Sequence, residues 1–429
     1  MSDGYIFPLP LTSDPCLIMV SLWAMQSVHP LAALKHRNFR LFWIGQIISL
    51  TGTWMHQAAQ GWLVYTLTDS PFFLGLAGTA ASAPILLFTL AGGVLVDRYS
   101  KRNIMLVSHV VLMFLAFTLA VLVVTGMVAV WHVLVIAFLI GTVHAIEIPA
   151  RQSFLIELVG RENLLNAIAL NSSAFHAARM VGPAIAGFLM GPLGLSSCFF
   201  INTLSFSSII FALLKMRFDS GKIKATQKSG VIKEFKEGIA YILHHPTVCI
   251  LLMSVGIISF FGFPYISFIP VYARDILHTG QKGLGMLMGC AGAGAFSGAV
   301  ILAIKGNTSK QGILMALAGI TFSTALLIFS LSTTAWLSYA MLFFVGLGAI
   351  NQIATANSIL QLMVPDKLRG RVMSAFTTMF LGMAPLGNFS VGSLAHFIGT
   401  QKALSIAAGC CLLGTVVIMV WKKREIVRL

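Results

Sequence analysis

Long apolar runs constrain this chain more than any other feature of its sequence. A helix of about 20 apolar residues is long enough to cross the hydrocarbon core of a bilayer. Hydrophobic residues make up 57% of the chain and charged residues only 10%, a balance outside that of soluble globular proteins. The sequence therefore predicts an all-α integral membrane protein with twelve transmembrane helices. Their approximate bounds are 41–67, 72–96, 104–126, 128–148, 167–190, 194–214, 248–272, 283–304, 312–331, 335–357, 371–394 and 400–421.

The basic residues predict which side of the membrane each loop faces. Of the 28 Lys and Arg residues, Arg179 lies inside a predicted span, and only Arg274, Lys282 and Lys402 fall on one side of the array. All the others fall on the opposite side. Because basic loops stay preferentially in the cytoplasm, both chain ends are expected there. A net charge of +15 would suggest nucleic-acid binding in a soluble protein, but its distribution here points to membrane topology instead, so no nucleic-acid partner is expected.

A long polar interruption divides the predicted spans into six and six. In this linker, residues 215–247, apolar side chains recur at helical spacing beside several lysines. We expect an amphipathic helix on the cytoplasmic surface that contacts anionic lipids; a partner-binding helix is the alternative. The tail over 1–35 is expected to be disordered or to precede the true start of translation. The other predicted units are a six-helix half over 36–214, a second half over 248–422, and a cytoplasmic tail over 423–429.

A short charged hinge separates the second and third predicted spans. Its sequence is Gly93-Val-Leu-Val-Asp97-Arg98-Tyr-Ser100-Lys101-Arg102, and the first glycine is expected to let two helix backbones approach closely. The hinge resembles the loop between the second and third helices of the major facilitator superfamily, where the pattern is Gly-x-Leu-x-Asp-Arg-x-Gly-Arg-Arg. Only the second glycine departs, because Ser100 stands in its place. The resemblance implies a secondary transporter with two six-helix halves.

Further stretches narrow the resemblance to one branch of that superfamily. They begin at Pro149, Asn166, Ala178, Arg369 and Pro385, and they look like the exporter branch that includes the enterobactin exporter and related drug efflux proteins. Within the third stretch, Gly182-Pro183-x-x-x-Gly187 is similar to the fifth-span signature of antiporters, although Ala178 replaces an upstream glycine. This element implies exchange of the solute against another ion, which we expect to be H⁺.

Both elements are candidates for gating. In the family, the hinge carboxylate latches the cytoplasmic side, so Asp97 is expected to bind the positive amino-terminal end of the helix that begins near Arg371. The alternatives are a merely solvated hinge and plain helix packing at the Gly-Pro element. The predicted gating residues are Gly93, Asp97, Arg98, Lys101, Arg102, Gly182, Pro183 and Gly187.

Charges inside the bilayer are costly and usually functional. Arg179 lies near the middle of the fifth predicted span, where it could bind an anionic substrate or form a structural pair with Glu147. Arg151 competes for the same carboxylate. Glu147 is also the leading candidate for proton coupling.

Polar and aromatic side chains on three other spans complete the predicted pathway. The resemblance implies that the first and tenth helices line the central cavity, and Phe residues of the seventh could add an aromatic wall. Such residues also commonly join one membrane helix to another, which is the alternative. The candidates are His56, Gln57 and Gln60, then Asn351, Gln352 and Asn357, and Phe261.

The expected function is therefore export of a small organic molecule, a siderophore or an amphipathic drug, across the bacterial inner membrane by a monomer. Import of a small solute and a transport-inactive scaffold remain alternatives. The chain contains no HExxH, GxSxG or Walker motif, so neither enzymatic activity nor ATP hydrolysis is expected. None of the six cysteines has metal-ligand or CxxC spacing, and no metal or other cofactor is expected.

Overall fold

The computed structural model describes residues 31–216, 240–305 and 311–421, which are almost entirely helical and contain no strand. Residues 1–30 of the predicted tail (1–35), residues 217–239 of the predicted linker (215–247) and the last residues, 422–429, lie outside the described residues. The predicted amphipathic linker helix therefore stays a prediction.

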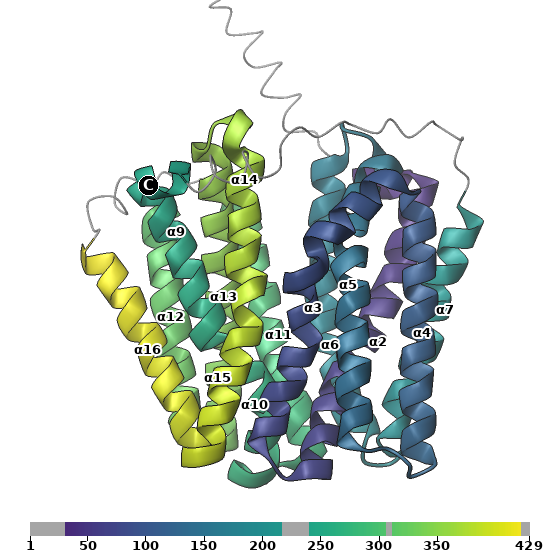
Figure 1. Cartoon of the computed structure of the whole chain (residues 1–429), viewed down its shortest axis with the longest axis vertical. Helices are drawn as coiled ribbons and strands as arrows, with labels where there is room; N and C mark the ends of the chain where they lie inside the picture. The colour runs from purple at the N-terminus through teal and green to yellow at the C-terminus, as the bar shows by residue number, and fades with distance from the viewer. Residues whose placement is uncertain (1–30, 217–239, 306–310, 422–429) are drawn as a thin grey trace, which may run out of the picture.

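The first part of the chain forms six long helices after a short 3₁₀ turn, η1 (Ala32–Lys35). They gather on one side of the molecule, on the right in Figure 1. Each begins or ends close to a predicted span boundary, because the apolar runs set their length. They are α2 (Arg37–Thr68), α3 (Pro71–Arg98), α4 (Lys101–Val124), α5 (Val130–Val159), α6 (Leu164–Leu189) and α7 (Ser196–Lys215).

The second part forms a second group, most of it on the left in Figure 1. Two of its membrane-length runs are built from several pieces. The first such run is α9 (Pro246–Ile257), η2 (Ile258–Gly262), α10 (Tyr265–Val271) and η3 (Tyr272–Ile276), and the second is α14 (Asp366–Thr377), η4 (Thr378–Gly382) and α15 (Met383–Ile398). The unbroken helices are α11 (Gly280–Lys305), α12 (Gln311–Leu331), α13 (Ala335–Met363) and α16 (Thr400–Trp421).

Nine helical segments of the described residues are long and apolar enough to cross a membrane. Helices α2, α6 and the α14–α15 run pack among them but carry more polar side chains, which lowers their hydropathy. The protein is thus an all-α, multi-pass membrane protein, and the count of twelve crossings stays a prediction.

Three helices differ clearly from the predicted bounds. Helix α5 continues to Val159 although its predicted span ends at 148, and Pro149 lies inside it without ending it. Helix α13 ends at Met363, six positions beyond the predicted 357, and helix α14 begins at Asp366, five positions before the predicted 371. All three differences have one cause. Hydropathy detects only the part of a helix that lies in lipid, whereas the backbone hydrogen bonds continue into polar sequence.

The wide turns η2, η3 and η4 are π-helical. Such turns insert an extra residue into a helix and are frequent at functional sites. The Ser259 hydroxyl of η2 donates a 2.6 Å hydrogen bond to the Phe380 carbonyl of η4. The two interrupted runs are therefore joined at their irregular turns.

The two helix groups touch backbone to backbone near one end of the molecule. We call this the Asp69 end, after the turn between α2 and α3, and the opposite one the Asp97 end. A Cβ atom added to Gly75 of α3 would lie 2.5 Å from the Asn388 carbonyl oxygen of α15, and one added to Gly187 of α6 would lie 2.8 Å from the Gly285 Cα of α11. Glycine is required at both contacts.

Candidate functional site

A small pocket lies between the two helix groups. It encloses about 10 Å³, space for roughly one water molecule. Helices α2 and α6 of the first group line one side, and α10 and α11 of the second line the other. The lining residues are Trp54, Arg179, Tyr265, Ile266, Ile269, Met288 and Ala291.

Arg179 is the charged residue of this pocket. Its Cζ lies 5.4 Å from the centre of the Trp54 ring, and the buried Tyr265 hydroxyl interacts with its guanidinium from the other group. No carboxylate of the described residues lies within 4.0 Å of it. An Arg at the centre of a membrane helix costs about 2.5–3.5 kcal/mol by insertion scales, whereas a cation–π contact contributes roughly 0.5–2 kcal/mol. The aromatic contact offsets only part of the cost.

The structural Arg179–Glu147 pair, one of the two alternatives for Arg179, does not form. Instead, Glu147 lies beside two residues of its own helix, with 3.5 Å between its Oε1 and Arg151 Nε and 3.6 Å between its Oε2 and His144 Nδ1. On α4, His109 is also close enough to act on this carboxylate electrostatically. Glu147 is only 3% exposed, and its Oε1 accepts no hydrogen bond from the described residues. Arg151 rather than Arg179 lies beside Glu147, because residues four positions apart share one face of a helix.

The charged hinge connects three helices of the first group. Lys101 Nζ lies 2.5 Å from Glu157 Oε1 of α5, and Arg102 Nε donates to the Leu213 carbonyl at the end of α7 over 2.7 Å. That end carries the negative pole of the helix dipole, which favours a cation. Asp97 and Arg98 are exposed at the end of α3.

The close approach of two helices that was expected at Gly93 is made by Gly92 instead. A Cβ on Gly93 would meet nothing within 4 Å, whereas one on Gly92 would lie 2.4 Å from the Ala145 carbonyl of α5. The two residues point to different sides of α3, and only Gly92 faces α5. In the Gly-Pro element, Gly182 packs against Thr51 of α2 and Gly187 against α11.

The predicted polar residues of the first and tenth spans lie away from the pocket. His56 Nε2 lies 3.1 Å from Gln60 Oε1, and its ring packs 4.8 Å from Phe199 of α7. Gln57 is exposed.

On α13, Asn351 donates to the Leu347 carbonyl over 2.8 Å, and Asn357 accepts from Gln361 over 3.0 Å. Gln352 faces Gly319 of α12. Phe261 packs against Phe260, with 4.8 Å between ring centres. Most of these contacts lie within one helix and only Gln352 reaches a second helix, so a role of these residues in transport stays a prediction.

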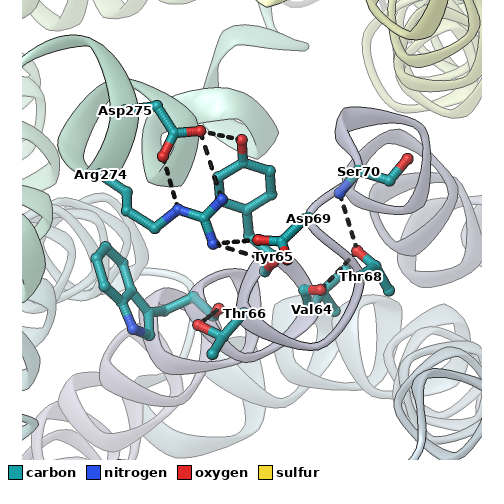
Figure 2. Close-up of polar contacts among 9 residues, drawn as sticks. Val64, Tyr65, Thr66, Thr68, Asp69, Ser70, Arg274 and Asp275 are labelled. Atoms are coloured by element: carbon teal, nitrogen blue, oxygen red, sulfur yellow. Dashed lines mark hydrogen bonds and ion pairs between the residues drawn. The ribbon is translucent and has the colours of Figure 1, made fainter.

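A cluster of charges joins the groups at the Asp69 end, and Figure 2 shows how its members lie. The Arg274 guanidinium stacks over the Tyr65 ring at 3.9 Å and forms a 2.7 Å ion pair with Asp69. Its Nε forms a second 2.7 Å ion pair with Asp275, the next residue in η3. The Tyr65 hydroxyl donates to the same Asp275 carboxylate. Each group therefore contributes two side chains to this cluster.

The family described as transmembrane secretion effector matches residues 28–427. The chain belongs to this family of major facilitator transporters. The match runs over almost the whole sequence, including both helix groups of the transporter and the stretch between them.

Similar proteins agree with that assignment. The staphyloferrin A transporter of Staphylococcus aureus (strain NCTC 8325 / PS 47) is 24% identical over 380 residues, or 86% of this transporter and 92% of that protein. The multidrug efflux pump Tap of Mycolicibacterium fortuitum is 24% identical over 376 residues, with coverage of 85% and 91%. The crystal structure of a POT family transporter in complex with 5-aminolevulinic acid has a TM-score of 0.73 at 10% identity, covering 90% and 96% of the two chains. That last likeness concerns the fold alone.

Sequence reasoning missed the cluster at the Asp69 end of the transporter. Its members Tyr65 and Asp275 are 210 positions apart in the chain. One signal was available, because Arg274 belongs to the few basic residues on its side of the predicted array and has an acidic neighbour. Arg179 could be found from the sequence because it is a charged residue inside an apolar span, whereas nothing in the sequence showed that Trp54 and Tyr265 would contact it.

Proposed function

We propose that this transporter exports a small organic molecule across the bacterial inner membrane by alternating access. The observation that carries the proposal is the pocket between the two helix groups. Both groups line it, and the Arg274 cluster and the glycine contacts close the molecule on one side of it. A solute that binds there crosses the membrane when the closure changes sides.

The basic loops support an orientation for this pathway. The basic loops of the described residues lie at the Asp97 end, and because such loops stay preferentially in the cytoplasm, they support a cytoplasmic location of that end and of both chain termini. The Asp69 end then faces outward, and the described conformation is closed to the exterior. In the opposite conformation, Asp97 binds the amino-terminal end of α14 and closes the cytoplasmic side.

We further propose that export is coupled to inward proton movement through Glu147. A buried carboxylate beside His144 and Arg151 can exchange a proton when the two groups move, because its electrostatic surroundings then change. The transporter acts as a monomer whose cytoplasmic linker contacts anionic lipid headgroups.

The names of the relatives support two substrate classes. A staphyloferrin A transporter favours a siderophore, and a multidrug efflux pump favours amphipathic drugs. Profiling the medium of a deletion strain, grown with and without iron, separates them. Loss of a secreted chelator selects the siderophore, whereas drug hypersensitivity with an unchanged medium selects drug efflux.

The direction of transport is tested with membrane vesicles of defined sidedness. Inside-out vesicles that carry the protein should accumulate the identified solute when a pH gradient is imposed. Accumulation only in right-side-out vesicles would indicate import, and no protein-dependent flux in either would indicate a transport-inactive scaffold. Either result contradicts the proposed export.

A further inference from the structure

We infer that the Arg179 pocket selects organic anions, with a carboxylate or phenolate group that binds the guanidinium. This inference rests on the proposed transport function and deepens it by naming the substrate class. It separates the two proposed substrate classes by charge, since an anionic siderophore would bind the guanidinium, whereas many amphipathic drugs are cations or neutral molecules.

The first step is the charge balance of the pocket. The guanidinium of Arg179 is a cation, and the described residues place no carboxylate within 4.0 Å of it. Its neighbours are Trp54 and Tyr265, and His176, one turn earlier on α6, is close enough to interact with it electrostatically. None of them supplies a negative charge. A bound anion therefore completes the site, whereas a cation is repelled.

The second step is the shape of the surroundings. Trp54 packs edge-on against Phe175, with 5.5 Å between ring centres, and Met288 and Ile269 line the side opposite. These walls suit an apolar or planar body attached to the anionic group. The planar fork of the guanidinium matches a carboxylate with two parallel hydrogen bonds.

The third step links binding to movement. Arg179 comes from the first helix group and Tyr265 from the second, and the space between them holds about one water molecule. A substrate can enter only when the groups move apart at this level. Once bound, an anion contacts both groups, so its binding biases the equilibrium between their two arrangements.

The test is binding to the purified full-length protein in nanodiscs, measured by calorimetry. The probes are 2,3-dihydroxybenzoate and citrate as anions, 2,3-dihydroxybenzamide as the neutral isostere, and tetraphenylphosphonium as the cation. We expect the benzoate to bind about tenfold to hundredfold more tightly than the benzamide, the value of one charged hydrogen-bonded contact. Arg179→Gln should remove this difference, and Arg179→Lys should retain part of it.

The control variant is Lys402→Gln, which removes an exposed cation of α16 and should leave all affinities unchanged. A thermal unfolding midpoint equal to that of the wild type shows that Arg179→Gln folds. If Arg179→Gln does not fold, the inference is judged on Arg179→Lys and on the preference of the wild type for anions. Equal binding of the benzoate and the benzamide, tighter binding of the phosphonium, or no binding of either anion overturns the inference. Export itself is judged separately in the vesicles, where transport of a cation that is insensitive to Arg179→Gln would leave export standing and this inference refuted.

Discussion

The Arg274 guanidinium lies 2.7 Å from the Asp69 carboxylate, and this ion pair bridges the two helix groups. The same guanidinium covers the Tyr65 ring and holds Asp275. One side chain thus makes most of the polar contacts that close this end.

Replacing Arg274 should open the Asp69 end more often than replacing Asp69. Asp69 is 75% exposed, so its ion pair alone contributes about 0–1 kcal/mol. Arg274→Gln also loses the Tyr65 stacking, worth roughly 0.5–1 kcal/mol at an exposed site. In a cysteine-free background with Met288→Cys in the pocket, an impermeant maleimide added outside intact cells should react fastest with Arg274→Gln. Lys402→Gln is the matched control, and equal labelling of all variants would contradict a latch.

Asp97→Asn should lower transport while the protein is made in normal amounts. The substitution removes the negative charge that would meet the positive end of α14 when the cytoplasmic side closes, an interaction worth about 0.3–1 kcal/mol or more if partly buried. The measurement is solute flux in vesicles at equal protein level. Glu162→Gln, another exposed carboxylate of the described residues, serves as the control. Equal flux in Asp97→Asn and wild type would count against the latch.

Glu147→Gln should abolish accumulation driven by a pH gradient. Solute exchange without a gradient should survive, because a neutral amide keeps the shape of the side chain but cannot release a proton. Both fluxes are measured in liposomes. Glu162→Gln removes an exposed carboxylate outside the charged hinge, and it should retain both activities. Gradient-driven accumulation by Glu147→Gln would exclude this carboxylate as the coupling site.

Gly187→Ala should destabilise the closed Asp69 end. The new methyl group would lie 2.7 Å from the Gln281 carbonyl oxygen and 2.8 Å from the Gly285 Cα, so α6 and α11 must separate, at a cost of about 1–3 kcal/mol. Thermal unfolding in nanodiscs should show a lower midpoint. Gly409→Ala is the control, because nothing lies within 4 Å of its added methyl group. An unchanged midpoint for Gly187→Ala would show that this contact adapts freely.

The helices were predictable from the sequence because the hydropathy that places a segment in lipid is a local property. That is why α16 (Thr400–Trp421) matches its predicted span. The extension of α5 beyond Pro149 was not predictable in this way. It depends on backbone bonds that continue outside the lipid, where hydropathy carries no information.

The candidate site was predictable only in part. The depth of Arg179 follows from counting residues along its span, but its partners depend on how α2, α6 and α10 are rotated against one another. The same rotation decides that Gly92 rather than Gly93 meets α5. Contacts of this kind join residues far apart in the chain, and a single sequence holds no record of them.

The hydrogen bond from Ser259 to Phe380 has a mechanical consequence. A π-helical turn interrupts the regular hydrogen bonding of an α-helix, and here a hydrogen bond joins two such turns, η2 and η4. A bend at one turn alone would break this hydrogen bond, at a cost of about 0.5–1.5 kcal/mol, so the bond favours bending of the two helical runs together.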